Sequence, residues 1–291
     1  MTRGTQEGDL GAVQTGSLKT HDGLTLFVRC WLPETDARAA IIVSHGYAEH
    51  SGRYEALAST LTGRGYAVYA LDHRGHGRSE GERANVAVFR AYVDDLARFI
   101  ERVREKDPRP PRFLLGHSMG GMIALQLVLE HPEKVEGVAV SAAFIENATQ
   151  VPWFLTRAAG AVSRLAPKLP VQHLDTDALA RDKRVVARYR NDPLVYHGKV
   201  KARLGAELLQ AGPYVLERAP SIRLPLLLMH GTGDRIAAVS GTQRFFERVG
   251  SSDKTLKLYD GAFHELFNDY GKEAVQRDVL AWLERQVGEE S

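Results

Sequence analysis

The feature that most constrains the fold of this chain is a serine flanked by glycines, Ser118, in the hexapeptide Gly116–Gly121. The apolar run Arg112–Leu115 precedes the hexapeptide, and a helix-like stretch, Met122–Leu129, follows it. A serine with glycines two positions before and after it, between a strand and a helix, is typical of a tight turn that strains the serine backbone and exposes its hydroxyl. A side chain on either flanking glycine would collide with that turn. The pattern therefore predicts a strand–turn–helix unit with a serine nucleophile at its tip.

The composition is that of an ordinary globular protein. Of 291 residues, 44% are hydrophobic and 25% are charged. The formal net charge of +2 gives no electrostatic reason to expect nucleic acid as a partner. The N-terminus lacks the apolar core of a signal peptide, and no window of about 18 apolar residues is present for a membrane span. We therefore expect a cytoplasmic protein whose residues 1–13 are disordered.

Strand-type runs alternate with amphipathic runs of helical length. The expected strands are Leu24–Leu32, Ala40–Ser44, Ala67–Leu71, Phe113–Leu115, Val135–Ser141, Leu224–Met229 and Thr255–Tyr259. The expected helices between them are Glu55–Thr62, Val86–Glu105, Met119–Glu130, Gly241–Val249 and Lys272–Val287. Several strands are apolar almost throughout, as strands covered on both faces are. The alternation predicts a mostly parallel sheet with helices on both faces.

One long interval, from Ala143 to Arg223, interrupts this alternation. A crossover between parallel strands needs only about a dozen residues, and structureless loops of this length are uncommon in compact domains. The interval has helical patterns of its own, at Phe154–Leu165, Ala178–Arg190 and Lys201–Gln210. We expect residues 14–291 to form one domain, with a helical cap inserted at about 145–217.

Two residues further along the chain complete a catalytic pattern. A serine hydroxyl needs an adjacent histidine to take its proton, and that histidine needs a carboxylate to fix its tautomer. In doubly wound hydrolases the chain order is serine, acid, histidine, with the last two on loops after later strands. Asp234 follows the expected strand Leu224–Met229, and His264 follows Thr255–Tyr259. The order predicts Ser118 as nucleophile, Asp234 as acid and His264 as base.

The same chemistry requires two backbone N–H groups that stabilise an oxyanion. Met119 directly follows the nucleophile, and Tyr47 lies on the loop that leaves the early strand Ala40–Ser44, so we expect their N–H groups to be the donors. Taken singly, each residue of this set also fits a structural role. An aspartate is common in turns, and a histidine is common in loops. Their conjunction at the ends of several strands favours catalysis.

Five segments resemble the monoacylglycerol lipase branch of the α/β-hydrolases, also described as hydrolase-4 or lysophospholipase-like. The matching segments are His45–Tyr54, Leu71–Ser79, Gly116–Gly121, Asn191–Leu194 and Lys254–His264. The likeness extends from about residue 17 to residue 287, over the sheet and the cap. It implies an α/β-hydrolase fold with a mostly parallel eight-stranded sheet, helices on both faces and an inserted helical cap. It also implies the triad Ser118, Asp234 and His264.

The resemblance further implies a serine hydrolase that cleaves monoacylglycerols to fatty acid and glycerol through an acyl-enzyme. Each buried acyl CH₂ contributes about 0.8 kcal/mol, which favours a medium-to-long chain. The alternatives are a lysophospholipase, a general carboxylesterase, another serine hydrolase chemistry such as cleavage of a C–C bond or an N-terminal peptide, or a non-enzymatic ligand receptor on the same fold. No cofactor or metal is expected, because no ligand set such as HExxH accompanies the histidine-rich turn Asp72–Gly77. The expected partner is a small lipid ester, and the sequence carries no signal for an oligomeric state.

Three residues outside the triad are candidates for substrate contact. Glu49 and Arg53 follow the oxyanion loop, where they either help to form the floor of the site or form a surface ion pair. The resemblance places a tyrosine near the site at Tyr189, and the alternative is a packed residue of the cap. Tyr47 departs from the family, in which a small residue often follows the His-Gly pair, so its ring is expected to narrow the mouth of the site or to contact the head group.

The first stretch of the cap, Val151–Val171, contains Arg157, Arg164 and Lys168 but no acidic residue. An apolar and weakly basic helix at the entrance of a site suits docking onto a lipid surface. The alternative is that its apolar face packs on the sheet domain. We expect peripheral contact with a membrane or micelle through the cap.

Overall fold

The structure is a computed structural model that describes residues 13–149 and 153–288, and of residues 153–158 it describes the backbone alone. The disorder expected for the N-terminus therefore concerns residues that lie almost wholly outside the described part, since only Val13 of that stretch is included. None of the helices that the structure describes combines the length and the apolar character needed to cross a lipid bilayer.

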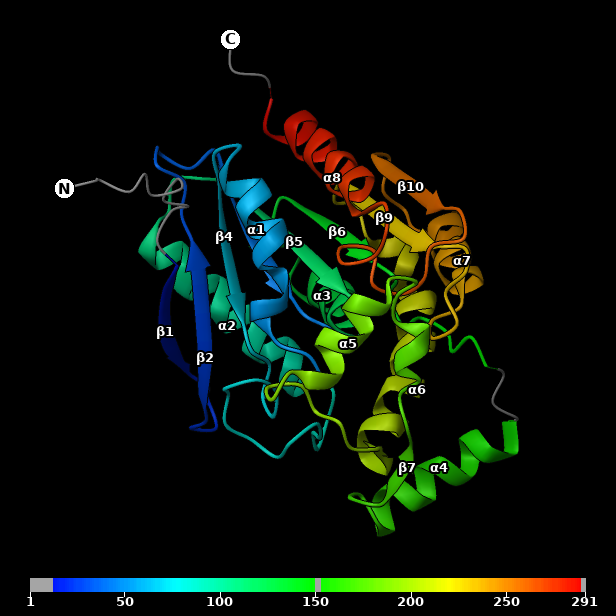
Figure 1. Cartoon of the computed structure of the whole chain (residues 1–291). Helices are drawn as coiled ribbons and strands as arrows, with labels where there is room; N and C mark the ends of the chain where they lie inside the picture. The colour runs from blue at the N-terminus through cyan, green and yellow to red at the C-terminus, as the bar shows by residue number, and fades with distance from the viewer. Residues whose placement is uncertain (1–12, 150–152, 289–291) are drawn as a thin grey trace, which may run out of the picture.

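One sheet of eight strands forms the body of the molecule (Figure 1). In spatial order the strands are β1 (Gln14–Lys19), β2 (Thr25–Trp31), β4 (Tyr66–Leu71), β3 (Ala39–Ser44), β5 (Arg112–His117), β6 (Gly137–Ser141), β9 (Leu226–Gly231) and β10 (Lys254–Tyr259). The pairs β1–β2 and β2–β4 are antiparallel, and all other pairs are parallel. Strands β3, β4, β5, β6 and β9 are buried at every position. The predicted mostly parallel eight-stranded sheet is confirmed.

Helices cover both faces of this sheet and enclose two apolar cores. On one face lie α1 (Glu55–Thr62) and α8 (Lys272–Val287), and on the other lie α2 (Arg90–Lys106), α3 (Met119–Glu130) and α7 (Val239–Arg248). The bounds of α1, α3 and α8 agree with the prediction. Helix α2 begins four residues later than predicted, because the segment before it is bound to another helix. Phe89 N donates to Glu207 Oε2, and Ala87 O accepts from Arg203 Nε.

The interval between β6 and β9, which we call the insert, contains three helices and two short strands. These are α4 (Trp153–Leu165), β7 (Pro170–Gln172), α5 (Lys183–Asn191), β8 (Val200–Lys201) and α6 (Ala202–Arg218). Figure 1 shows α4 and β7 at the end of the insert that is remote from the sheet. Helix α6 is longer than predicted, because it continues through Pro213 and packs on both α4 and α3. Because α6 packs on one helix of the insert and on one helix of the body, no sharp boundary separates the two. The limits of the insert at 145–217 therefore stay a prediction.

The turn between β5 and α3 has the strained geometry that the glycine pattern predicts. Ser118 adopts φ 52° and ψ −118°, a conformation that is rare for a residue with a side chain. A Cβ on Gly116 would lie 2.6 Å from the carbonyl oxygen of Gly120. A Cβ on Gly120 would overlap the carbonyl oxygens of Ser44 and His45, at the end of β3. The second glycine thus permits close contact between the start of α3 and the end of β3.

Substituting Gly120 with alanine is expected to lower the free energy of unfolding by about 3 kcal/mol, because a methyl group has no room against the β3 backbone. Urea denaturation of the purified protein measures the change. The control is Gly160→Ala in α4, where a Cβ has no neighbour within 4 Å. This control is expected to be neutral, or to stabilise by up to about 1 kcal/mol through helix propensity. Equal stability of the Gly120→Ala protein and the wild type would contradict the packing described.

Candidate active site

Three side chains from distant parts of the chain meet at the carboxyl ends of β5, β9 and β10. His264 Nε2 lies 2.8 Å from Ser118 Oγ, and His264 Nδ1 lies 2.7 Å from Asp234 Oδ2. A carboxylate accepts hydrogen bonds, so Nδ1 carries a proton and Nε2 accepts from the serine hydroxyl. The side chains of this group are buried. The structure thus brings together the three residues that the sequence order singled out, in a chain along which a proton can pass.

The carboxylate of Asp234 is held by four donors. Its Oδ1 accepts from the backbone N–H groups of Ile236 (2.8 Å) and Ala237 (3.1 Å). Its Oδ2 lies 3.1 Å from His230 Nε2 in addition to its contact with His264. Burial alone would raise the pKa of Asp234, but the charge of His264 and the hydrogen bonds from both histidines hold this pKa well below its usual range.

Sequence reasoning missed His230, which is fully buried at the end of β9, four residues before the acid. Its Nδ1 lies 2.7 Å from Thr242 Oγ1, and its Nε2 lies 3.1 Å from the carbonyl oxygen of Ala237. A carbonyl can only accept, so Nε2 carries the proton and also points toward the carboxylate of Asp234. The only sequence signal for this contact is the short spacing between the histidine and the acid.

The base itself is tuned by the charges around it. Burial would lower the pKa of His264, but the charge and the hydrogen bond of Asp234 oppose this effect. The carboxylates of Glu265 and Glu49 add to the opposition, and the pKa of His264 is raised above its ordinary value of about 6.5. A more basic imidazole takes the serine proton more readily. The same shift means that the ring becomes protonated, and unable to act as a base, at a higher pH than an ordinary histidine.

A second histidine, His117, packs against the base. The centroids of the two rings are 4.9 Å apart, and His117 Nδ1 lies 3.3 Å from Ser141 Oγ. Burial lowers the pKa of His117 to about 3, so the ring is neutral near pH 7. It forms an uncharged wall beside His264.

The loop after β3 lies against the nucleophile. A Cβ on Gly46 would be 3.3 Å from Ser118 Cβ. Gly46 N donates to Glu49 Oε1 (2.6 Å), and Gly46 O lies 2.8 Å from His45 Nδ1. His45 Nε2 accepts from the backbone N–H of His73 at 2.9 Å, so Nδ1 is the protonated nitrogen and donates to Gly46 O. The Gly46–Tyr47 peptide is therefore held through its carbonyl by His45, and the preceding peptide is held through Gly46 N by Glu49.

Fixing the carbonyl of that peptide also fixes the direction of the Tyr47 N–H group. A carbonyl and the following N–H belong to one planar unit and point in opposite directions. Among the hydrogen bonds of the described residues, neither Tyr47 N nor Met119 N appears as a donor. Both expected oxyanion donors thus lie beside Ser118 and remain free to bind an oxygen.

A cavity of about 640 Å³ opens onto Ser118 and His264. Its apolar wall comes largely from the insert and includes Val162, Val171, Leu174, Leu179, Leu208 and Leu209. Its polar wall includes Glu49, Glu265 and Tyr189. A serine nucleophile at the mouth of a mostly apolar cavity with a few polar groups suits an ester with an alkyl chain.

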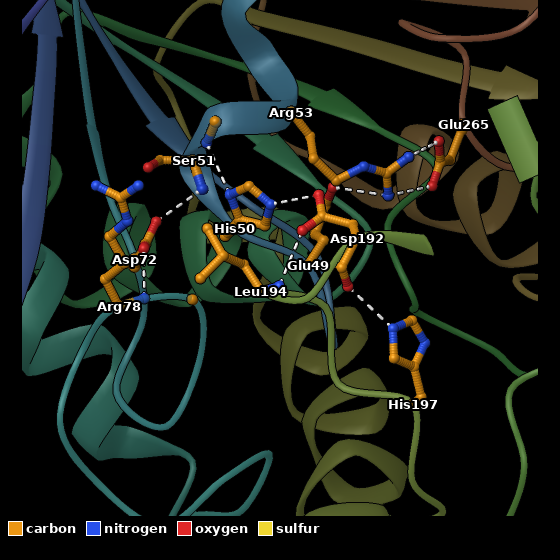
Figure 2. A network of polar contacts seen from close by, with 12 residues as sticks. Glu49, His50, Ser51, Arg53, Asp72, Arg78, Asp192, Leu194, His197 and Glu265 are labelled. Carbon is orange, nitrogen blue, oxygen red and sulfur yellow. Dashed lines mark hydrogen bonds and ion pairs between the residues drawn. The ribbon is translucent and has the colours of Figure 1, made fainter. Parts of the chain in front are cut away.

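The polar wall is a buried ion-pair network (Figure 2). Arg53 binds both oxygens of Glu265, at 2.8 and 2.7 Å, and lies 3.4 Å from Glu49 Oε2. Glu49 Oε1 also accepts from the hydroxyl of Tyr54. Of the two alternatives for Glu49 and Arg53, a surface ion pair is wrong: the two side chains are buried and are already bound to one another. Tyr189 differs, because its hydroxyl is buried without a partner among the described residues, while its ring packs 4.6 Å from the Arg53 guanidinium.

Comparison with known proteins gives consistent matches. A family model described as serine aminopeptidase S33, Hydrolase_4, matches residues 35–271. A monoacylglycerol lipase of Mycolicibacterium smegmatis is 38% identical over 261 residues, which are 90% of this chain and 93% of that protein. A monoglyceride lipase of Homo sapiens is 38% identical over 269 residues, or 91% and 89% of the two chains.

Solved structures agree with these matches. A soluble variant of monoglyceride lipase from Saccharomyces cerevisiae, in complex with a substrate analog, is 25% identical with a TM-score of 0.86, over 98% of this chain and 97% of that one. The monoacylglycerol lipase of Paleococcus ferrophilus is 31% identical with a TM-score of 0.78, over 94% and 99%. The expected α/β-hydrolase fold is confirmed.

Replacing Asp234 with asparagine is expected to lower kcat by about 10⁴, since the imidazole loses its partner and its correct tautomer. Neutral His264 is the active form, so kcat/KM of the wild type falls as the pH drops through a midpoint above about 6.5. Without the Asp234 charge that raises this pKa, the midpoint of the variant moves to lower pH. Hydrolysis of a soluble p-nitrophenyl ester across the neutral range measures both effects.

The matched control is Asp260→Asn, an exposed acid on the loop after β10 that leaves the triad untouched. It is expected to keep the rate and the midpoint of the wild type. An Asp234→Asn protein with an unchanged rate and midpoint would remove Asp234 from the proposed role.

Proposed function

This chain belongs to the Hydrolase_4 family, and from that premise we propose that it hydrolyses monoacylglycerols with a medium-to-long acyl chain to fatty acid and glycerol. It is a carboxylic ester hydrolase. The observation that carries the proposal is the chain of contacts Ser118–His264–Asp234 at the mouth of an apolar cavity. The monoacylglycerol substrate follows from the names of the relatives together with this cavity.

The first half-reaction acylates the serine. His264 Nε2 takes the proton of Ser118 as Oγ attacks the ester carbonyl carbon, and the carbonyl oxygen becomes an oxyanion. The N–H groups of Tyr47 and Met119 stabilise that oxyanion, while Asp234 stabilises the imidazolium. When the tetrahedral intermediate collapses, the bond to the glycerol oxygen breaks. His264 then delivers its proton to that oxygen, and glycerol leaves.

The second half-reaction releases the fatty acid. A water molecule takes the place of the departed glycerol and gives a proton to His264 while its oxygen attacks the acyl carbon. The same two N–H groups hold the second oxyanion. Collapse breaks the bond to Ser118 Oγ, which recovers its proton from the imidazolium. The acyl chain meanwhile occupies the apolar wall of the cavity, where each buried CH₂ contributes about 0.8 kcal/mol.

For the glycerol group we propose Tyr189 as the direct contact, because its hydroxyl is buried beside the polar wall and lacks a partner among the described residues. We propose a supporting role for Glu49 and Arg53, whose polar atoms already bind Gly46 N, Tyr54 and Glu265. A peptidase would need a free carboxylate for the substrate ammonium. Arg53 is ion-paired with both carboxylates of the polar wall, so neither is free to bind an ammonium group, which favours an ester substrate.

One observation keeps a lysophospholipid as the second candidate substrate. Arg235 contributes to the lining of the cavity, and a guanidinium binds a phosphate well. Its Nη2 donates to the carbonyl oxygen of Asp177, and its guanidinium packs 5.0 Å from the ring of Phe263. These contacts occupy only part of its donor capacity.

We also propose that residues 145–217 act as a cap within a domain of residues 14–291, and that the cap contacts a membrane or micelle. Support comes from large apolar side chains that are exposed near the end of α4: Leu165 is 88% exposed, and Leu169 and Val171 are about half exposed. Arg164 directly precedes Leu165 and Lys168 directly precedes Leu169 in the sequence, as suits an anionic lipid surface. The side chain of Arg157, expected to join this group, lies outside the described residues.

A substrate panel tests the proposed reaction. Purified protein is expected to release fatty acid over many turnovers from monoacylglycerols, with lower kcat/KM on lysophosphatidylcholine and little action on triacylglycerol, since one glycerol site leaves no room for further chains. Ser118→Ala is expected to lower kcat by about 10⁴ or more. Fatty acid is measured over time. A single slow acylation without turnover would indicate a receptor, and preference for the lysophospholipid would select the second candidate.

A double substitution tests the lipid contact. Leu165→Ser with Leu169→Ser is expected to weaken binding to phosphatidylcholine–phosphatidylglycerol vesicles about tenfold or more, because two apolar side chains lose their burial in lipid. Hydrolysis of a soluble p-nitrophenyl ester should stay unchanged. Leu258→Ser is the control, since Leu258 is an exposed apolar residue on β10, away from the insert. Co-sedimentation measures binding, and full retention by the double variant would contradict the proposal.

A further inference from the structure

Two sequence motifs that the mechanism above does not use meet in the structure. His50 is the last residue of the loop between β3 and the short helix Ser51–Tyr54, which we call the oxyanion loop, and Asp192 belongs to the segment Asn191–Leu194 at the end of α5 in the insert. They are 142 positions apart, yet His50 Nε2 lies 2.9 Å from Asp192 Oδ2 (Figure 2). This contact joins the insert to the loop that carries a proposed oxyanion donor.

The hydrogen-bond roles in this contact are fixed. His50 Nδ1 accepts from Gly52 N at 3.2 Å, so Nε2 carries the proton and donates to the carboxylate. On the other side, Asp192 Oδ1 accepts from Leu194 N at 2.9 Å, and Asp192 O accepts from His197 Nε2 at 3.0 Å. Neither partner can rotate without losing a second hydrogen bond. The pair therefore has one arrangement.

A second hydrogen bond connects the same two segments. Tyr196 N, four residues after Asp192, donates to Ala48 O at 2.8 Å. Ala48 is buried and has φ 67°, in the left-handed region that costs a residue with a side chain about 1–2 kcal/mol. Such a conformation persists where surrounding contacts enforce it. The insert thus holds the loop on both sides of Glu49, through the backbone of Ala48 and the side chain of His50.

The opposite side of this loop is anchored to the body. Asp72, at the end of β4, accepts from Ser51 N and from Arg78 N, both at 2.8 Å. Glu49 in turn accepts from Gly46 N within the loop, and the next residue, Tyr47, bears the free N–H. The oxyanion loop is therefore held between a fixed anchor on the sheet and two hydrogen bonds from the insert.

We infer that Asp192 and His50 are positioning residues. Their hydrogen bond couples the position of the insert to the orientation of the Tyr47 N–H group. The inference rests on the oxyanion role in the proposed function. It makes the insert part of the support of the oxyanion site as well as a wall of the acyl cavity. Displacing one oxyanion donor costs up to about 10²–10³ in kcat, and a shift of about 1 Å can cost 10². Loss of the pair therefore lowers kcat by about 10- to 100-fold.

Matched substitutions at His50 isolate the contact. In His50→Asn the side-chain oxygen still accepts from Gly52 N as a helix cap, but the side chain is too short to reach Asp192. In His50→Gln the longer amide still donates to Asp192. Asp192→Asn keeps the acceptor for Leu194 N and presents an N–H₂ group to the N–H of His50. Circular dichroism and thermal unfolding show whether each variant is folded.

The readouts separate positioning from a general structural role. Turnover of p-nitrophenyl acetate does not depend on the acyl cavity, and inhibition by an alkyl trifluoromethyl ketone reports the oxyanion donors through its tetrahedral adduct. We expect His50→Asn and Asp192→Asn to lower kcat by about 10- to 100-fold on acetate and on monoacylglycerol, with KM within about threefold. The affinity of these variants for the ketone is expected to fall by the same factor. The kcat of His50→Gln is expected to stay within about threefold of the wild-type value. The kcat of the double variant, His50→Asn with Asp192→Asn, is expected to be no lower than that of either single variant.

Two results would overturn the inference. One is a folded His50→Asn or Asp192→Asn protein whose kcat on the acetate ester and affinity for the ketone match the wild type, whatever its thermal stability. The other is a rise in KM for the long-chain substrate alone, which would mean that the pair shapes only the acyl cavity. If the wild type turns over the acetate ester but not monoacylglycerol, the substrate proposal fails while this test still stands.

Discussion

The active-site geometry depends on one backbone constraint, the strained positive-φ conformation of Ser118 between β5 and α3. That conformation exists because glycines stand two residues before and after the serine, and Gly120 lets the start of α3 pack directly on the carbonyl oxygens at the end of β3. The close packing has two consequences. It presents the hydroxyl to His264, and it brings the loop after β3 beside the serine. Ser118 and the proposed oxyanion donors are thus placed by the same contact.

The charges that surround this constraint are buried and paired. Asp234 is bound by backbone N–H groups and two histidines, which keeps it ionised and raises the pKa of His264. Arg53 stands between Glu49 and Glu265, so that two further carboxylates can lie near the imidazole without a large net charge. A buried charge without such a partner would cost several kcal/mol. The pairing therefore lets a polar site persist at the wall of an apolar cavity.

Much of this arrangement was predictable, because it follows from local patterns. The apolar runs of the central strands and the periodicity of α1, α3 and α8 identified the body, and chain order identified Ser118, Asp234 and His264. Strand β1 gave no such signal, since five of its six residues are exposed and its sequence is polar. The later start of α2 was equally unpredictable, because a side chain on α6 forms a hydrogen bond with the backbone directly before α2.

The remaining gaps have the same cause, namely contacts between residues far apart in the sequence. From the sequence, His230 was only a residue of an apolar strand. The structure shows that its ring lies against Asp234. Glu49 and Arg53 were readable as a surface pair, because nothing local indicates that Glu265, 212 residues from Arg53, completes a buried network. The link from Asp192 to His50 is of this kind too. Sequence patterns specify which elements form, and long-range hydrogen bonds decide how the loops between them are held.

The central claim is that Ser118 is made nucleophilic by His264 and by no other group. Intact-protein mass spectrometry after treatment with an alkyl fluorophosphonate tests it most directly, with peptide mapping to locate the adduct. The account predicts one phosphonyl group on Ser118, formed rapidly in the wild type and about 10³-fold or more slowly in His264→Ala. An adduct at a different residue, or labelling of Ser118 at an undiminished rate without the imidazole, would contradict it.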